Sequence, residues 1–303
     1  MPRLALAQAF PNKPITLICP WPPGGGADAQ MRALANAASK VFGQQVVIEN
    51  RSGATGTVGA ASLLNAKADG YTLSQATNAV YRQPFIGKTV YDPAKDFTYI
   101  LGVTSFNFGL VVRSESPYKS MAELMEAAKA APGKLTYGTF GNGSPPQTVM
   151  DRLEAKNGAQ MTHIPFKGTA EGIIALRGGH IDALADGTGW AQFVDGGQFR
   201  LLAVFGDKRL KRWPNVPTLK ELGYDVAEVS PWGIIGPKGI EPAVVKVLHD
   251  GFRKAMDDPE FLKALELLVQ EPTYMSTEDY RTYSLGQIPV QKAIVEKYKL
   301  AQP

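Results

Sequence analysis

The sequence predicts an α/β protein built from two similar halves. Residues 15–76 alternate short apolar segments with helical segments in the order strand, loop, helix, which is typical of a parallel sheet with right-handed crossovers. The same alternation begins again after Ser120. A chain of 303 residues, of which 44% are hydrophobic and 20% charged, is long enough for two soluble domains that each have their own core.

Apolar runs and helical spacing place the elements of the first half. The expected strands cover residues 15–19, 46–50 and 71–76, and the expected helices cover 27–41 and 58–67. In such a sheet, the loops that bind ligands follow the carboxyl ends of the strands. The glycine-rich loops at 24–26 and 53–56 and the segment 77–85, which is expected as a loop, all follow strands in this way.

Extended segments lead the chain into the second half and back. Residues 99–103 and 109–113 lead in, and residues 229–237 return as a strand to the first half. Ser120 is the expected N-cap of the first helix between them. The further strands are expected at 135–138, 161–166, 181–185 and 201–205, and the further helices at 121–131, after Ser144, and at 169–177, 243–256, 259–268 and 277–299.

The first glycine-rich loop is the stretch around which the chain is organised. A stiff proline run, residues 20–23, ends in three glycines and then a helix. Glycines let the backbone approach a ligand closely, and the free N–H groups at a helix start suit a carboxylate or phosphate. The alternative is a tight turn capped by Asp28, with Trp21 holding the proline loop against the sheet. The candidate ligand contacts are Pro23, Gly24, Gly25, Gly26, Ala27 and Asp28.

A second glycine-rich loop, residues 138–146, precedes a helix in the second half. Two helix starts that face each other across a cleft would hold the charged groups of one small anion. Ser144 is the expected N-cap of this helix, and that use is compatible with bonding the ligand. The candidate contacts here are Thr139, Phe140, Gly141, Gly143 and Ser144.

The distribution of basic residues, cysteine and histidine argues against several classes of protein. The net charge is +4, and the densest basic group, residues 208–212, has no aromatic residues around it, so no nucleic-acid partner is expected. Cys19 is the single cysteine, which excludes an internal disulfide, and its strand position predicts a small buried residue rather than a nucleophile. Because the three histidines are far apart, no metal is expected.

Motifs of enzymes and cofactor sites are missing from the glycine-rich loops. Neither loop has the GxGxxG or Gly-Lys-Ser/Thr spacing of nucleotide sites, and Gly141 to Ser144 is not the GxSxG turn of hydrolases. Asp28 and Asp186 could form an acid/base pair across a cleft, but separate capping roles explain them better. We therefore expect no cofactor and no catalysis.

The first ten residues resemble the end of an export signal. The segment Leu4 to Ala9 has the small-residue pattern of a cleavage site, without the basic and long apolar regions of a whole signal. We expect a truncated signal and a mature protein that begins near Gln8 or Phe10 and works outside the cytoplasm. No apolar run approaches the roughly 20 residues of a membrane helix, so a bilayer-spanning segment is not expected.

Short motifs lie in a specific order along nearly the whole chain. They are Lys13 to Ile15 with Pro20 to Asp28, Val47 to Arg51, Ala68 to Leu73, Tyr91 to Phe97, Pro132 to Gly138, Phe166 to Gly168, Gly178 to Asp182, and Val216 to Gly223. In this order they resemble the Bug-type solute-binding receptors of tripartite tricarboxylate transporters, which are secreted bacterial proteins. No single motif is decisive, but the ordered set is strongly specific.

The resemblance implies a two-lobed periplasmic binding fold of the Venus-flytrap type, with the ligand in the cleft between lobes. The first lobe would comprise residues 10–105 and 230–303, and the second lobe residues 106–229. A ligand carboxylate would be held between the loops at 22–29 and 138–144 by backbone N–H groups and ordered water, so that no arginine is needed. Hinge closure is expected near residues 104–108 and 227–233.

Departures from the family pattern concern the ligand. The family often continues toward a histidine after Gly143-Ser144, whereas two prolines stiffen the helix start here. Asn78 and Arg82 follow the third strand in a region that varies across the family. Arg82 either neutralises a second carboxylate or points into packing or solvent, and Tyr81 or Phe85 either flank an apolar ligand body or pack inside.

Three further residues of the second half are candidate ligand contacts. Thr169 begins a helix and is expected to line the cleft. Asp186 either accepts a bond from a ligand hydroxyl, amine or bridging water, or caps residues 188–190. Trp190, like Phe140, either walls the cavity or packs beneath it.

These observations predict a periplasmic receptor that closes over a small organic acid, either a dicarboxylate or an aromatic carboxylate, and passes it to membrane transporter subunits. We expect a monomer. The alternatives are an α/β enzyme that acts on a small organic acid and a ligand sensor for a membrane signalling protein. A structural or interaction module would leave two ligand-type loops without a use.

Overall fold

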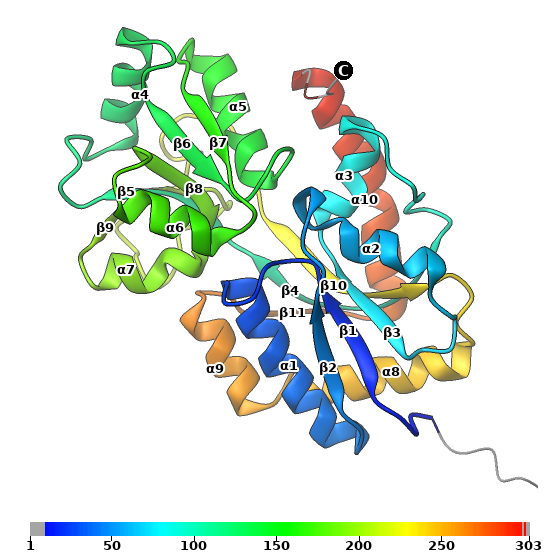
Figure 1. The fold of residues 1–303 in the computed structure, drawn as a ribbon. Helices are drawn as coiled ribbons and strands as arrows, with labels where there is room; N and C mark the ends of the chain where they lie inside the picture. The colour runs from blue at the N-terminus through cyan, green and yellow to red at the C-terminus, as the bar shows by residue number, and fades with distance from the viewer. Residues whose placement is uncertain (1–9, 299, 301–303) are drawn as a thin grey trace, which may run out of the picture.

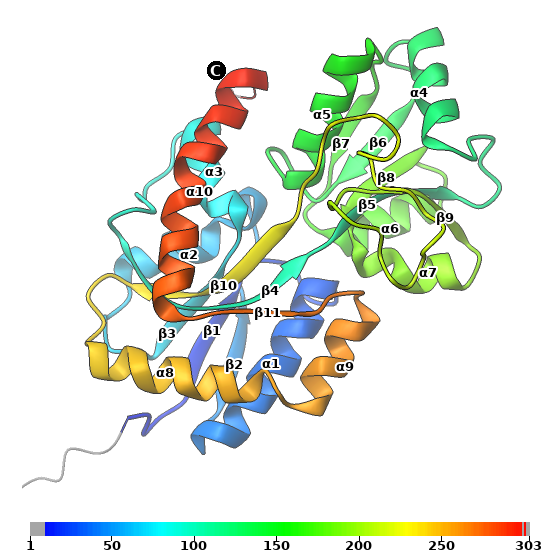
Figure 2. The same cartoon turned by 180° about the vertical axis from the view of Figure 1, so that it is seen from behind.

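Two sheets organise the structure, a computed structural model that describes residues 10–298 and 300 (Figure 1). The first sheet has six strands in the order β11-β4-β10-β3-β1-β2, and the second has five in the order β7-β6-β8-β5-β9. Each sheet lies inside its own lobe, with helices on both faces (Figure 1, Figure 2). The predicted two-lobed α/β fold is confirmed.

The first sheet begins with three parallel strands, because β1 pairs in parallel with both β2 and β3. β10 joins this sheet antiparallel to β3 and β4, and β11 pairs with β4 at the edge. The six strands are β1 (Ile15–Cys19), β2 (Val46–Asn50), β3 (Thr72–Ala76), β4 (Phe97–Phe106), β10 (Ser230–Pro237) and β11 (Pro272–Met275). The loops that follow β1 and β3 share one edge of the sheet, as expected for parallel strands.

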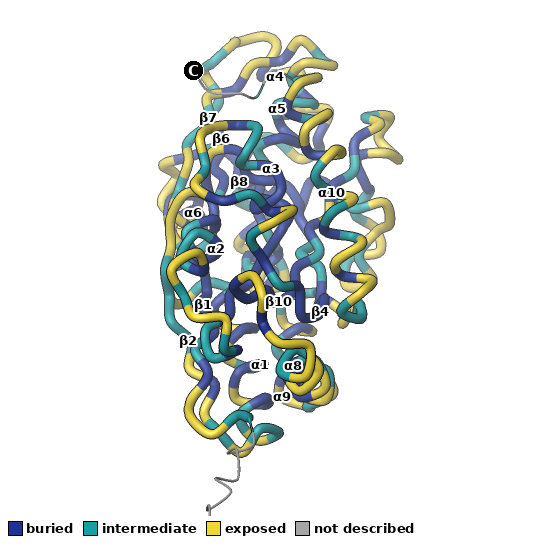
Figure 3. The backbone as a smooth tube through the Cα atoms, turned by 90° about the vertical axis from the view of Figure 1, so that its right-hand side faces the viewer, coloured by how far each residue is buried: buried dark blue, intermediate teal, exposed yellow. Residues whose placement is uncertain are grey.

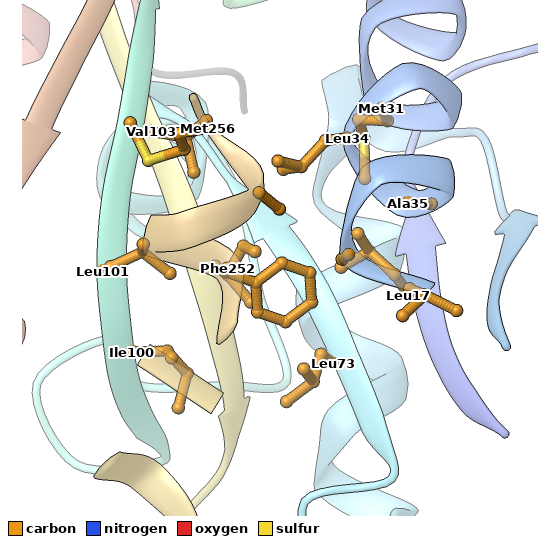
Figure 4. Close-up of a cluster of buried hydrophobic side chains, with 14 of the residues drawn as sticks. Leu17, Met31, Leu34, Ala35, Leu73, Ile100, Leu101, Val103, Phe252 and Met256 are labelled. Atoms are coloured by element: carbon orange, nitrogen blue, oxygen red, sulfur yellow. The ribbon is translucent and has the colours of Figure 1, made fainter. Parts of the chain in front are cut away.

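One face of the first sheet packs against three helices. Leu17 of β1 belongs to a buried cluster with Met31, Leu34 and Phe252, which Figure 4 shows between the helices and the strands. Apolar burial of this kind contributes about 25 cal/mol per Å² of area removed from water, so this cluster is a main source of the lobe's stability. The helices are α1 (Gly26–Phe42), α8 (Pro242–Ala255) and α9 (Pro259–Leu267).

The opposite face of this sheet carries a second cluster, because neighbouring residues of a strand point to opposite sides. Ile18, next to Leu17, packs in it with Tyr81 and Tyr280. The α-helices on this side are α2 (Val58–Ser62), α3 (Asn78–Ile86) and α10 (Thr277–Tyr298), and the 3₁₀ helices are η1 (Ala54–Gly56) and η2 (Leu63–Asn65).

The second sheet is covered in the same way. Met125 and Leu153 belong to the cluster on one face, and Leu176 and Phe199 belong to the cluster on the other. Its strands are β5 (Phe108–Arg113), β6 (Thr136–Thr139), β7 (Thr162–Pro165), β8 (Ala183–Gly187) and β9 (Phe199–Val204). Its helices are α4 (Met121–Ala130), α5 (Pro145–Asn157), α6 (Thr169–Arg177), η3 (Thr188–Trp190) and α7 (Ala191–Asp195). Figure 3 shows buried backbone running through the strands, with exposed residues on the outer helices.

Two crossings join the lobes within the described residues. The first is Asn107, between β4 and β5, and its side-chain Nδ2 donates to the carbonyl of Val269 at 2.8 Å. The second leads from Glu228, whose N–H bonds the carbonyl of Phe205 at 2.7 Å, into β10. Both crossings fall within the segments where hinges are expected, and hinge motion and the lobe boundaries stay predictions.

The expectation of a loop at residues 77–85 is wrong, because Asn78 to Ile86 form helix α3. Thr77 caps it by accepting from the N–H of Ala79 at 3.3 Å. Pro84 lies inside the helix and cannot donate to the carbonyl four residues earlier, which belongs to Val80. That carbonyl instead accepts from the hydroxyl of Tyr91 at 3.1 Å, so the proline is tolerated.

The other expected elements are found with small differences. The helix expected over 58–67 is shorter, since α2 ends at Ser62 and the 3₁₀ helix η2 follows, and the edge strand β11 was missed. Cys19 is buried, as predicted, and burial raises the pKa of its thiol to about 12. The expected export signal at residues 4–9 lies outside the described residues. Along the described part, no helix combines the length and apolar character needed to cross a membrane.

Candidate ligand-binding site

A cavity of about 60 Å³ lies between the two lobes, where loops from both sheets meet. The first lobe contributes the start of α1 and a segment after α9, and the second contributes the starts of α5 and α6 and the loop after β8. A buried water needs roughly 10–15 Å³ of such volume, so the cavity has room for more than a single water.

Helix α1 begins at the cavity with exposed N–H donors. Gly25 is its N-cap, has an extended backbone and makes no side-chain capping bond. Gly24 before it has φ +83°, which suits glycine, and its N–H is bound by Asp28 Oδ2 at 3.0 Å. Gly25, Gly26 and Ala27 line the cavity, so the first N–H groups of α1 and the positive end of its dipole are directed to it.

Helix α6 begins on the opposite wall. Its N-cap, Gly168, also makes no side-chain capping bond, and Gly168, Thr169 and Ala170 line the cavity. A Cβ added to Gly168 would lie 3.1 Å from Pro22 Cδ, so the two lobes touch here. The cavity is therefore bounded by two helix starts, one from each lobe, as the sequence predicts, but the partner of α1 is chiefly α6 rather than α5.

Asp186, at the end of β8, is the buried acidic group of the cavity. It has no exposed surface, and its Oδ1 accepts from Thr169 Oγ1 at 2.7 Å and from the N–H of Gly187 at 2.6 Å. Its Oδ2 is buried without a hydrogen-bond partner. Burial raises the pKa of this carboxyl to about 7, and the two hydrogen bonds act in the opposite direction.

Aromatic side chains form the apolar wall. Trp21 and Phe140 meet edge to face across the lobes, with ring centroids 5.2 Å apart. The Trp21 ring is held in place because its Nε1 donates to Gln75 Oε1 at 2.8 Å. Gly56 leaves room for the ring, since a Cβ added at that position would lie only 2.6 Å from it. Trp21 thus holds the proline loop, as predicted, and lines the cavity as well.

Several predicted contacts lie behind the cavity wall and support the loops that form it. Ser144 caps α5 by accepting from the N–H of Gln147 at 3.4 Å, and Thr139 Oγ1 accepts from the N–H of Gly141 at 3.2 Å. Asp28 is bound by Arg32 and Asn50, and although burial raises its pKa, these bonds bring the pKa below its ordinary value.

The remaining predicted contacts have other surroundings. Trp190 lies under the cavity and donates from Nε1 to the carbonyl of Asp186 at 3.2 Å. Asn78 donates to the carbonyl of Val229 at 3.2 Å, beside the second crossing. Pro23 and Gly24 are exposed, and Gly143 offers its carbonyl to Arg82. None of these residues lines the cavity in the described part of the chain, and their contact with a ligand stays a prediction.

Arg82 is buried in a network of its own between the lobes. Its guanidinium lies 3.1 Å from Glu228 Oε1 and donates to Gln291 Oε1 at 2.6 Å and to the carbonyl of Gly143 at 3.3 Å. Burial lowers the pKa of Arg82 and raises that of Glu228, because both charges lose water. Tyr81 of the same helix packs in the core and donates to Ser284 at 2.8 Å.

Sequence reasoning missed part of the cavity wall. Gly168 and Gly187 are the N-caps of α6 and η3 and could have been found as glycine caps before helical turns. Leu268 and Gln270 come from the segment after α9, far along the chain, and no local signal marks them. The other missed residues of the cavity wall include Phe106, Phe108, Glu171 and Gly189.

Comparisons with known proteins agree in family and fold. The family model described as tripartite tricarboxylate transporter family receptor matches residues 30–300. A curated relative from Cupriavidus necator, a UPF0065 protein in the gbd 5′ region, is 44% identical over 302 residues, covering 100% of this chain and 92% of the relative. The solved periplasmic binding protein BugD has a TM-score of 0.92 at 27% identity, over 97% of this chain and 100% of its own. Rpa4515 of R. palustris, solved with adipate, has a TM-score of 0.90 at 26% identity, over 96% of this chain and 99% of its own.

Proposed function

Since this chain belongs to the tripartite tricarboxylate transporter family receptors, which are periplasmic solute-binding proteins rather than enzymes, we propose that it captures a small carboxylate between its lobes. It then delivers this acid to the membrane subunits of a tripartite transporter. The observation that carries the proposal is the cavity bounded by the starts of α1 and α6, one from each lobe. N–H groups at helix starts bind anions, and a carboxylate held by both would favour the closed arrangement of the lobes.

The carboxylate is bound by backbone N–H groups of Gly25, Gly26 and Ala27 from α1 and of Thr169 and Ala170 from α6. No Lys, Arg or His is found among the described residues that line the cavity, so helix dipoles and hydrogen bonds meet the ligand charge. The predicted contacts that do not line the cavity hold the loops or reach the ligand through water; they are Pro23, Gly24, Asp28, Asn78, Arg82, Thr139, Gly141, Gly143, Ser144 and Trp190.

The apolar wall of the cavity favours an acid with an apolar body, either a dicarboxylate or an aromatic carboxylate. Trp21, Phe106, Phe108 and Phe140 supply an apolar wall against the body of such a ligand. Adipate, the ligand bound by Rpa4515, belongs to the first of these classes.

Export and capture belong together in this proposal. The family works in the periplasm, and the small-residue pattern at residues 4–9 supports an export signal on this chain. We propose that the receptor acts there as a monomer, with Asn107 and the segment before β10 as the hinge.

A thermal-shift screen with isothermal titration of the hits tests the proposal. The panel contains acetate, succinate, adipate, benzoate, citrate, glutamate, phosphate and glucose. A ligand that binds only the folded state raises the melting temperature, so we expect a rise with succinate, adipate or benzoate. A rise with only phosphate or glucose, or with none of the panel, would overturn the carboxylate assignment.

A matched pair of variants shows whether binding uses the start of α6. Ala170→Asp places a carboxylate at the second residue of α6, inside the cavity, where it competes with the ligand. An acidic residue in a first helical turn is stabilising, so the variant keeps its fold. Ala122→Asp makes the same change at the second residue of α4, at an exposed position outside the cavity. We expect Ala170→Asp to weaken binding at least tenfold and Ala122→Asp to leave it unchanged.

A further inference from the structure

The side chain of Asp186 has one satisfied oxygen and one free oxygen. Oδ1 accepts two hydrogen bonds, from Thr169 Oγ1 at 2.7 Å and from the N–H of Gly187 at 2.6 Å. Oδ2 is fully buried and makes no hydrogen bond with the described residues, although Asp186 lines the cavity. A buried oxygen without a partner is unfavourable, so the position of Oδ2 at the cavity suits a bond that forms with a ligand.

Among the lining residues that the structure describes, no positive charge compensates this carboxyl. The charged side chain that lines the cavity beside Asp186 is another acid, Glu171 of α6, which is exposed. Basic groups on the packed elements are directed elsewhere. Arg32 of α1 binds Asp28, and Arg177 of α6 lies over the ring of Phe193. Burial raises the pKa of Asp186, and no neighbouring charge contributes to that shift.

A carboxylate ligand would meet an unfavourable partner if Asp186 were ionised. Two negative charges about 4 Å apart repel each other strongly where water is excluded, and two such carboxyl groups usually share one proton. With a proton on Oδ2, the side chain keeps Oδ1 as the acceptor for Thr169 and Gly187. It then offers an O–H donor to a ligand oxygen, and such O–H···O⁻ bonds are short and strong.

We propose that Asp186 carries a proton on Oδ2 in the bound state and donates it in a hydrogen bond to a carboxylate oxygen of the ligand. This inference rests on the proposed function, because it requires the ligand to be a carboxylate. The proton comes from solvent and forms the O–H bond on Oδ2, so each carboxylate binds together with up to one proton, and no bond of the ligand is broken. The side chain therefore selects acids that have an oxygen acceptor, not an ammonium group, at this position.

The pH dependence of adipate binding tests the proposal. Ordinary carboxylic acids have pKa values of about 4 to 5, so adipate is largely ionised from pH 6.5 upward and its own titration contributes little. Because the pKa of Asp186 is raised to about 7, we expect adipate to bind about 50- to 100-fold more weakly at pH 9 than at pH 6.5. Titration at pH 7.5 in buffers of low and high ionisation enthalpy should show net proton uptake. Succinate and benzoate serve as probes in the same way.

Asp186→Asn is the decisive variant. An asparagine keeps an acceptor oxygen for Thr169 and Gly187 and places a permanent N–H donor where the proton would be. We expect it to bind adipate within a fewfold of the wild type at pH 6.5, to lose the pH dependence and to take up no proton. Asp182→Asn is the matched control. Its carboxyl accepts from Thr136 outside the cavity, so the pH dependence should remain.

Thr169→Val provides a second variant if Asp186→Asn does not fold. It removes a donor to Oδ1 that favours the ionised form, so the pH at which binding weakens should move upward.

Two results would overturn the inference alone: binding of adipate that is independent of pH in the wild type, or a loss of more than tenfold in Asp186→Asn with glutamate as the preferred ligand. The second result would mean that Asp186 accepts from an ammonium group. Failure of every acid to bind at either pH would overturn the proposed function, and this inference with it.

Discussion

Gly26 and Gly189 face each other across the cleft, so close that a Cβ on either one would touch the backbone of the other. A Cβ added to Gly26 would lie 3.7 Å from Gly189 Cα, and a Cβ added to Gly189 would lie 4.0 Å from the nitrogen of Gly26. Gly26 opens α1 in the first lobe, and Gly189 lies in η3 of the second. The absence of side chains at both positions lets the two lobes meet beside the cavity.

A β-branched side chain at position 189 should therefore keep the lobes apart. We expect Gly189→Val to weaken carboxylate binding by about 5- to 100-fold, since its methyl groups extend beyond a Cβ that already touches Gly26 and lies 3.0 Å from Thr169 Cγ2, and such overpacking costs about 1–3 kcal/mol. The affinity is measured by titration calorimetry and the separation of the lobes by small-angle scattering. Gly286→Val, on α10 with nothing within 4 Å of the added Cβ, is the control and should bind normally. Equal affinities for both variants would contradict the role of this contact.

Thr55 supplies a hydrogen bond between the lobes, because its Oγ1 donates to the carbonyl of Asn142 at 2.5 Å. Thr55→Val keeps the shape of the side chain and removes the donor, so we expect a two- to tenfold loss of affinity, equivalent to about 0.5–1.5 kcal/mol. Because the bond joins the lobes rather than their cores, thermal stability without ligand should change little. Thr162→Val removes a comparable bond within the second lobe, to Gly133, and should not affect binding.

Replacing only one member of the buried pair Arg82 and Glu228 should lower the free energy of unfolding strongly. Arg82→Met leaves the Glu228 carboxylate buried, and removing one member of such a pair typically costs about 3–5 kcal/mol. Arg152 lies 3.9 Å from Glu228 Oε2 and still offers a positive charge to this carboxylate, so the loss of unfolding free energy should be near the lower end of that range. Urea unfolding measures the change. Arg82→Met combined with Glu228→Gln should recover most of the stability, whereas Arg253→Ala, which breaks an exposed pair with Asp257, should cost less than about 1 kcal/mol.

His163 should make the protein sensitive to acid. Burial lowers the pKa of its imidazole to about 4, so between about pH 6.5 and 4 the unfolded chain binds more protons than the folded one. The contribution of His163 to stability is therefore present above pH 6.5 and is lost as the pH falls, by at most about 1.4 kcal/mol per pH unit. His163→Gln should reduce this loss in urea unfolding followed from pH 7 to 4.

The contribution of Asp151 to stability should change with pH in the opposite direction, so this residue provides the control for His163. Burial raises the pKa of this carboxyl to about 6, so its contribution to stability is present below about pH 4 and is lost as the pH rises through 6. Asp151→Asn should remove that loss while leaving the acid sensitivity in place. If both variants changed the pH dependence in the same direction, neither group would titrate as described.

Much of the fold could be predicted because its signals are local. The apolar run of β1, the glycine at the end of α1 and the serine cap of α4 each act within a few residues. Helix α3 could not be predicted, because Pro84 is tolerated only when Tyr91 bonds the carbonyl of Val80. β11 pairs only with an edge strand far away in sequence, and nothing in its four residues indicates this.

The candidate site also combines features that local sequence signals predict with features that depend on distant contacts. The start of α1 was predicted, because helical spacing follows the three glycines, although a tight turn capped by Asp28 was the alternative interpretation of this loop. The choice of α6 over α5 as its main partner depends on how the lobes are set against each other. Arg82 has the chemistry of a ligand contact, but Glu228, 146 residues later in the chain, meets its charge in the structure. Long-range pairing, rather than residue type, decides where such a side chain is directed.

The order of strands in the first sheet determines when this lobe can be completed during synthesis. β4 has no bond to β3, because β10 lies between them. Until residues 230–237 leave the ribosome, the first sheet consists of β2, β1 and β3 alone, and β4 has no neighbour in it. The second lobe draws its five strands from residues 108–204, so it can fold earlier. The nascent chain thus keeps its first lobe unfinished for most of translation, and this lobe can close its sheet only after the second lobe has been synthesised.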